Sequence, residues 1–148
     1  MPRMYFAHPI NVYDTPLEAF LLERIRRTFP SWEIENPNRP HHQRGYQERL
    51  AKTGRGMDYY YEDVLPLCNG CIALPFIDGA WGTGVFGESK HLARLGAVTF
   101  RISHRGVIRP MIFRRQNVLT VDETRSRIRT PSGLRIPYEG FPAIELFD

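Results

Sequence analysis

The chain has 148 residues, of which 42% are hydrophobic and 24% are charged. This length and composition predict one globular domain with its own core, and they exclude a disordered chain. No apolar run approaches the ~20 residues that a membrane helix needs, and the sequence begins without a signal-peptide pattern. We therefore expect a cytoplasmic protein with no membrane partner.

The formal net charge is +4, and it is unevenly distributed. Residues 1–102 carry 12 basic and 11 acidic groups, whereas residues 103–148 carry eight basic and five acidic groups. Nearly all the cations are arginine, which suits bidentate phosphate recognition but would also follow from codon bias in a GC-rich genome. A nucleic-acid partner is not expected, because no known binding motif appears and acidic residues interrupt the basic ones.

Strand-like and helical patterns alternate along the first two thirds of the chain. In chain order we expect a strand at 4–7, a helix at 16–29, a strand at 32–34, a short helix at 46–52, a helix at 57–67, a strand at 71–76, a helix at 84–95 and a strand at 97–102. Pro66 should distort the last turn of its helix. The Pro/Asn-rich loop at 36–45 is expected to rim the functional site.

Alternation at this spacing indicates crossover βαβ units. We therefore expect an α/β fold, a flavodoxin- or Rossmann-like three-layer sandwich with a mostly parallel, five-stranded sheet. Residues 1–148 are expected to form a single domain whose core ends at residue 102.

Residues 103–148 are expected to add a small C-terminal β extension to this core. The expected short strands lie at 107–113, 118–121 and 125–129, with a turn at 131–133. They would supply the fifth strand and a small hairpin. The tail at 144–148 is acidic and apolar, and it would suit either an interface or its own domain.

Cys68 and Cys71 form a lone Cys-x-x-Cys pair. Because a zinc site needs a second ligand pair, and His41-His42 alone supports one only weakly, we expect these cysteines to pack in the core. We expect no metal and no cofactor.

A glycine-rich loop between a buried strand and a helix is the expected centre of the protein. Gly82, Gly84 and Gly87 precede Glu88, which we place in the first turn of the following helix. In open α/β sheets, ligands bind where strands end and helices begin. Thr83 and the loop amides are candidates for holding a 5′-phosphate. Taken alone, Glu88 is better explained as a surface residue that stabilises the start of its own helix.

Three segments of the chain resemble the nucleoside 2-deoxyribosyltransferase-like family, which includes nucleoside 5′-monophosphate N-glycosidases. Met4-Tyr5-Phe6-Ala7-His8-Pro9 resembles the family's first strand. Tyr61-Glu62-Asp63-Val64-Leu65 resembles the helix before its central strand, and the loop from Gly84 to Glu88 resembles its nucleophile loop. The resemblance spans residues 4–102. The chain departs from the family pattern at His8, Gly82, Phe86, Lys90 and Leu92.

A looser resemblance points the same way. Leu74-Pro75 and Gly82-Thr83 resemble the loop of the cytokinin-activating phosphoribohydrolases, which also cut N-glycosidic bonds of nucleotides. The two resemblances imply cleavage of the N-glycosidic bond of a (deoxy)nucleoside or nucleoside 5′-monophosphate, by hydrolysis or by transfer to another base. The first also implies a homodimer or larger assembly. The alternative is an arginine-rich nucleotide- or nucleic-acid-binding or sensor module that keeps the fold without catalysis.

The resemblance implies roles for three catalytic residues. Glu88 would form a covalent glycosyl intermediate, Asp63 would handle the base as acid or hydrogen-bond partner, and Tyr5 would orient Glu88. The candidates for substrate binding are His8, Asp78, Trp81, Gly82, Thr83 and Gly84. Most of these residues also have a structural explanation: Asp63 as a solvated helix carboxylate, Tyr5 as a packed strand aromatic, and Asp78 as part of an Asp-Gly turn.

Overall fold

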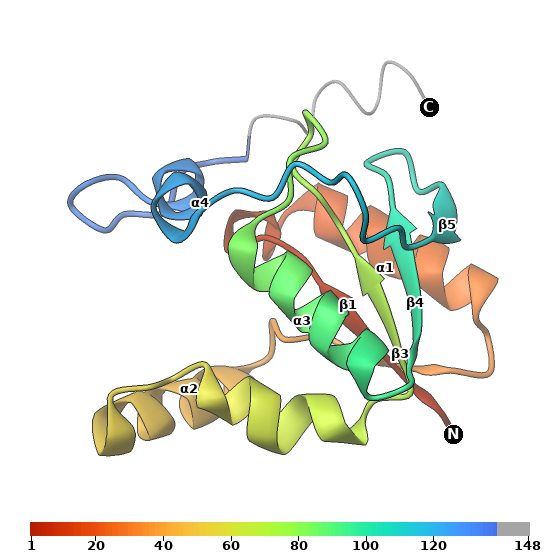
Figure 1. Cartoon of the computed structure of the whole chain (residues 1–148), viewed down its shortest axis with the longest axis horizontal. Helices are drawn as coiled ribbons and strands as arrows, with labels where there is room; N and C mark the ends of the chain where they lie inside the picture. Colours follow the sequence, from red (N-terminus) through yellow and green to blue (C-terminus); the bar gives the residue numbers. More distant parts are fainter. Residues whose placement is uncertain (139–148) are drawn as a thin grey trace.

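A computed structural model of the chain describes residues 1–138 (Figure 1). Five strands form one sheet in the order β2-β1-β3-β4-β5. The strands are β1 (Arg3–Ala7), β2 (Glu33–Glu35), β3 (Gly70–Ala73), β4 (Val98–Ile102) and β5 (Ile108–Pro110). The first four strands pair in parallel, whereas β5 pairs with β4 in the antiparallel direction. The expected five-stranded, mostly parallel sheet is therefore confirmed.

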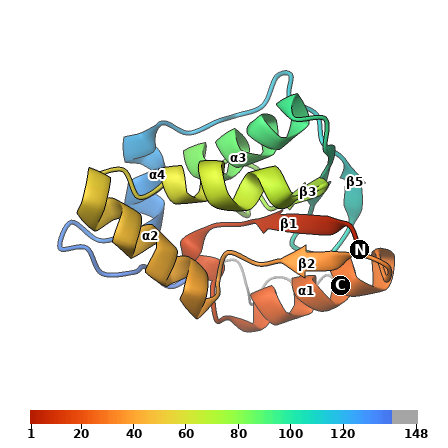
Figure 2. The same ribbon diagram turned by 90° about the horizontal axis from the view of Figure 1, so that it is seen from below.

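Helices cover both faces of this sheet (Figure 2). The helical elements are η1 (Ile10–Val12), α1 (Pro16–Thr28), α2 (Pro40–Thr53), η2 (Tyr60–Val64), η3 (Leu65–Leu67), α3 (Thr83–Arg94) and α4 (Val121–Ile128). Successive side chains of a strand point to opposite faces of the sheet. Phe6 of β1 accordingly packs in the core under α1 with Leu21, while Tyr5 packs in the core under α3 with Leu92. The three-layer expectation holds.

Local sequence explains where the main helices begin and end. Thr15 caps α1, because its Oγ1 accepts a hydrogen bond from the Glu18 amide at 3.2 Å, and Pro16 occupies the first helical position. Gly54 ends α2 in the left-handed conformation, with φ of 76°. The helix expected at 57–67 is broken into the π turn η2 and the 3-10 turn η3, in agreement with the distortion expected at Pro66.

Two expectations about local structure are wrong. The loop expected at 36–45 ends at Arg39, because Pro40 takes the first position of α2, which runs well beyond the short helix expected at 46–52. The strands expected at 118–121 and 125–129 are absent from the described chain. Residues 121–128 form α4 instead, and Val118 makes only an isolated bridge with Trp81.

The capping of α4 explains the second error. The Thr120 side chain accepts from the Glu123 amide at 3.1 Å, and the Glu123 carboxylate accepts from the Thr120 amide at 2.9 Å. This reciprocal capping box is a strong signal for a helix start. The expected turn at 131–133 is present, and it joins Arg129 and Arg135 in an antiparallel bridge. The tail at 144–148 lies outside the described residues.

Two other sequence expectations concern burial and membranes. Cys68 and Cys71 are free and buried, and both belong to the core under α3. Within residues 1–138, no helix combines the length and the apolar character needed to cross a lipid bilayer.

Candidate active site

A cavity of about 510 Å³ opens at the carboxyl ends of β1, β2 and β3. Its volume lies in the range of small-molecule sites. β1 and β3 are neighbours in the sheet, and from them the strand order runs in opposite directions. Open α/β sheets bind ligands at such a switch point. The cavity therefore occupies the place where this fold is expected to carry chemistry.

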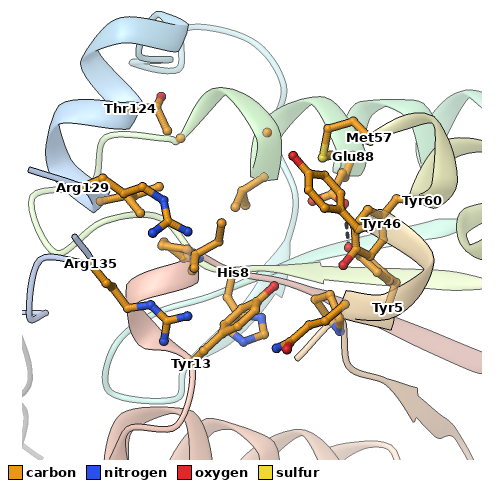
Figure 3. A pocket seen from close by; sticks show the side chains of 18 of the residues that line it. Tyr5, His8, Tyr13, Tyr46, Met57, Tyr60, Glu88, Thr124, Arg129 and Arg135 are labelled. Carbon is orange, nitrogen blue, oxygen red and sulfur yellow. Dashed lines mark hydrogen bonds between the residues drawn. The ribbon is translucent and has the colours of Figure 1, made fainter. Parts of the chain in front are cut away.

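Glu88 and Tyr5 meet in the wall of this cavity (Figure 3). The Tyr5 hydroxyl donates a hydrogen bond to Glu88 Oε2 at 2.6 Å, and both side chains are buried. Glu88 is the sixth residue of α3, which begins at Thr83, so it lies in the second turn and not in the first. Since the effect of a helix dipole falls off within the first turn, the helix start does little to offset the burial of this carboxylate.

Burial raises the pKa of Glu88 to about 7, while the hydrogen bond from Tyr5 acts in the opposite direction. The pKa of Tyr5 is itself raised well above its usual value, first by burial and then by the charge of Glu88. Tyr5 thus stays a hydrogen-bond donor at neutral pH. A carboxylate that titrates near neutrality inside a cleft is typical of a functional site.

His8 lines the cavity, but neither of its ring nitrogens is available to a ligand. Nδ1 lies 2.8 Å from the Phe6 carbonyl oxygen, and Nε2 lies 2.8 Å from Glu18 Oε2. The imidazole also stacks on the Phe6 ring, with 3.9 Å between ring centroids. The His8 side chain is completely shielded from solvent, so it packs beneath the cavity and offers a ligand no ring surface.

Gly82 and Gly84 also line the cavity. A Cβ atom at Gly84 would meet nothing within 4 Å, so the packing of the described chain does not require glycine at this position. A Cβ atom at Gly82 would make ordinary contacts of 3.4 Å with Phe76 and Thr124. The space beside Gly84 is open to a ligand.

Two expected site residues on the glycine-rich loop form hydrogen bonds with the C-terminal segment and not with the cavity. The Thr83 hydroxyl donates to the Leu119 carbonyl, and the Thr83 amide donates to Thr124 Oγ1 at 3.0 Å. The Trp81 side chain is buried, and its Nε1 donates to Gln116 Oε1 at 2.9 Å. Both residues position the loop and are not among the residues that line the cavity.

Two expected acidic site residues also lie outside the cavity lining. Asp78 accepts two hydrogen bonds from the Arg127 guanidinium, each at 2.9 Å, and this pair anchors α4 to the end of β3. Asp63 is exposed on η2, where its Oδ2 lies 2.8 Å from Nη2 of Arg49. The structure thus brings Tyr5, His8, Gly82, Gly84 and Glu88 together, and leaves the other four candidates outside.

Several lining residues have no counterpart among the sequence candidates. On one side of the cavity are Tyr46, Met57 and Tyr60, near Glu88; on the other are Tyr13, Arg129 and Arg135 (Figure 3). Tyr13 follows β1 by a few residues, and a residue just beyond the carboxyl end of a strand can be predicted from the sequence to lie near the site. The two arginines could not be located without the path of the C-terminal segment.

Among residues 1–138, one group of side chains has the spacing of a metal site. The ligand atoms of Glu35, His41 and His42 lie within 4.8 Å of one another. However, His42 Nε2 lies 2.5 Å from Glu35 Oε1, and its Nδ1 lies 2.8 Å from the Tyr59 hydroxyl. These hydrogen bonds account for the cluster as a link between β2 and α2, and we assign no metal to it.

Comparisons of the chain with protein-family models, with curated proteins and with solved structures find no match. The Rossmann-like sheet topology and the cavity at its switch point are what define the site.

Proposed function

We propose that the protein cleaves the N-glycosidic bond of a nucleoside or nucleotide through a covalent glycosyl intermediate on Glu88. The observation that carries the proposal is the buried pair of Glu88 and Tyr5, joined at 2.6 Å in the wall of a cavity of ligand size. A carboxylate kept ionisable near neutrality, oriented by one donor and facing open space, suits nucleophilic attack on a sugar carbon.

The reaction proceeds in two displacements. First, a Glu88 carboxylate oxygen bonds to C1′ while the bond from C1′ to the base nitrogen breaks, and the departing base takes up a proton from solvent. Second, water or another base bonds to C1′ and releases a proton to solvent, and the bond to Glu88 breaks to restore the carboxylate. With water, the products are the free base and the sugar with a C1′ hydroxyl. Both displacements pass through an oxocarbenium-like state that the negative charge of Glu88 stabilises.

Tyr5 is a positioning residue in this scheme. Its hydroxyl occupies one lone pair of Oε2 and holds the carboxylate in place, which leaves the remaining lone pairs for C1′. The expected general acid, Asp63, forms its ion pair with Arg49 outside the cavity. The proposal therefore depends on Glu88 and Tyr5, and a role of Asp63 stays a prediction.

The arginine-rich C-terminal part supports a small-molecule role over binding of a nucleic acid. Arg127 is paired with Asp78, and both Arg129 and Arg135 line the cavity. The implied homodimer or larger assembly is part of the proposal and can be checked by sedimentation.

The proposal is tested by incubating the protein with a panel of nucleosides and nucleoside 5′-monophosphates and measuring free base by chromatography. Wild type should release base, and Glu88→Gln should not. Glu48→Gln is the matched control, since Glu48 is an exposed carboxylate outside the cavity. Intact-protein mass spectrometry should reveal a glycosyl adduct on the wild type and on Glu48→Gln.

Two results would reject the proposal. One is equal base release by wild type and Glu88→Gln. The other is arginine-dependent nucleotide binding with no release from any substrate, which would identify a binding or sensor module.

A further inference from the structure

The end of the cavity away from Glu88 carries two positive charges that the fold places side by side. Arg129 and Arg135, which flank the turn at 131–133, point into the cavity (Figure 3). They are direct partners in an antiparallel bridge. The flanking hydrogen bonds run from the Thr130 amide to the Leu134 carbonyl, and from the Ile136 amide to the Ile128 carbonyl. These bonds make the arginines a non-hydrogen-bonded pair, the arrangement in which opposite side chains are closest.

Like charges directly opposite each other in a strand pair are destabilising. Within residues 1–138, neither guanidinium has a carboxylate partner. Arg129 donates to the Gly133 carbonyl at 3.1 Å, and the Arg135 guanidinium lies 5.9 Å from the centroid of the Tyr13 ring. Each guanidinium has five N–H donors, so most of them stay available to a ligand.

The acidic and basic groups of the cavity are separated. Glu88 is the single carboxylate among the described residues that line it. Figure 3 shows Glu88 beside Tyr5 and Tyr60, with the two guanidinium groups on the far side of His8 and Tyr13. An anionic group of a ligand is thus attracted to the arginines, while the opposite end of that ligand meets Glu88.

The segment that carries the arginines is held firmly against the active-site loop. The Asp78–Arg127 ion pair and the hydrogen bond from the Thr83 amide to Thr124 join α4 to the loop. Trp81 pairs with this segment as well, because its amide donates to the Asn117 carbonyl at 2.8 Å and its carbonyl accepts from the Leu119 amide at 2.9 Å. The arginines are therefore positioned before any ligand arrives, which favours binding.

We propose that Arg129 and Arg135 form an anion subsite for a phosphate monoester, and that the substrate is a nucleoside 5′-monophosphate. The second half of this inference rests on the proposed function. With C1′ at Glu88, the 5′ substituent points away from the reacting carbon across the width of the sugar ring, toward the arginines. Two guanidinium groups can hold a phosphate through several charge-assisted hydrogen bonds, and their mutual repulsion is relieved when it binds.

The anion subsite is tested by titration calorimetry of the whole chain with ribose 5-phosphate and with ribose. Ribose 5-phosphate should bind at least about tenfold more tightly to wild type, and this preference should disappear in the Arg129→Gln/Arg135→Gln double variant. Arg125→Gln is the control, because Arg125 is exposed on α4 and does not line the cavity. Lysine at either position should restore part of the affinity, since it keeps the charge without the bidentate fork.

A stability readout separates a binding role from a structural one. Without ligand, the double variant should melt at least as high as Arg125→Gln, because a like-charge pair has been removed. Added ribose 5-phosphate should raise the melting temperature of wild type but not that of the double variant. A double variant that melts far below the control would show that the arginines are structural and would overturn the subsite.

The subsite and the proposed function can fail independently. Arginine-dependent binding of ribose 5-phosphate without base release from any substrate would leave the subsite standing and reject the enzyme. Release of base at equal kcat/KM from nucleosides and their 5′-monophosphates, unchanged in the double variant, would leave the enzyme standing and overturn the subsite.

Discussion

The Tyr5 hydroxyl donates to a Glu88 carboxylate oxygen at 2.6 Å, across 83 positions of sequence. The bond links strand β1 to the helix α3, and both residues are almost completely shielded from solvent. A buried carboxylate is costly unless it is hydrogen-bonded. Tyr5 is the one donor to the Glu88 carboxylate within residues 1–138, so burial is only partly compensated and the pKa lies near neutrality.

The pH dependence of catalysis should report this pair. If Glu88 must be ionised to attack C1′, kcat/KM rises with pH through the pKa of about 7. Tyr5→Phe removes the hydrogen bond that lowers this pKa, so the rising limb should move up by about one pH unit. The measurement is a kcat/KM profile for base release, with Tyr59→Phe as the control. If kcat/KM rises over the same pH range in Tyr5→Phe and in wild type, the Tyr5 hydroxyl does not lower the pKa of Glu88.

Stability should depend on pH through the same carboxylate. The folded pKa of Glu88 is raised from 4.5 to about 7, so in this interval the folded state binds more protons than the unfolded state. The Glu88 contribution is therefore favourable at low pH and is lost as pH rises through about 7. Between about pH 5 and 8, the free energy of unfolding of wild type should fall by about 2–3 kcal/mol relative to Glu88→Gln.

Urea denaturation of wild type and Glu88→Gln at about pH 5 and about pH 8 gives this difference in the free energy of unfolding. The contributions of all other titrating groups are common to the two proteins and cancel. A constant difference between wild type and Glu88→Gln would mean that the carboxylate is not buried as described.

Substitution of Gly84 should separate folding from binding. Alanine at this position meets nothing within 4 Å, and in a helix it is favoured over glycine by about 1 kcal/mol. Gly84→Ala should therefore be as stable as wild type or more stable, while the added methyl group narrows the cavity beside the sugar and raises KM. Steady-state kinetics and thermal denaturation together give both quantities.

Lys90→Ala is the control for Gly84→Ala, because it changes the exposed face of the same helix outside the cavity lining. It should leave KM unaltered. An unaltered KM in Gly84→Ala as well would show that the substrate does not approach this part of α3.

Asp63→Asn tests whether the expected acid acts in catalysis. Because Asp63 is exposed and paired with Arg49, its substitution should change stability by at most about 1 kcal/mol and leave kcat close to wild type. Glu62→Gln, which removes the other carboxylate near Arg49, is the comparison. A fall in kcat comparable to that of Glu88→Gln, with no such fall in Glu62→Gln, would show that Asp63 reaches the base.

The sequence was a good guide where structure depends on local and periodic signals. The alternation of buried strands with helices of 3.6-residue period predicted the sheet, and the helix expected at 16–29 corresponds to α1. A local signal also marks the start of α4, where Thr120 and Glu123 have the spacing of a capping box, although a strand was expected there. Pro40 at the start of α2 is a second case.

The site was only partly predictable, because side-chain partners come from distant parts of the chain. The pairing of Tyr5 with Glu88 followed from a family resemblance. By contrast, nothing local to Asp78 indicates that Arg127 takes its carboxylate, and nothing local to Arg129 and Arg135 places them in the cavity. These contacts depend on how residues 114–138 return across the loop, which is a tertiary property.

The attachment of α4 through Arg127 and Thr124 also bears on how such a protein could diversify. Tyr5 and Glu88 belong to β1 and α3, whereas Arg129 and Arg135 on the opposite wall belong to a short stretch near the other end of the sequence. Exchange of that stretch, with its anchors kept, would change which ligands the cavity accepts and leave the pair of Tyr5 and Glu88 in place.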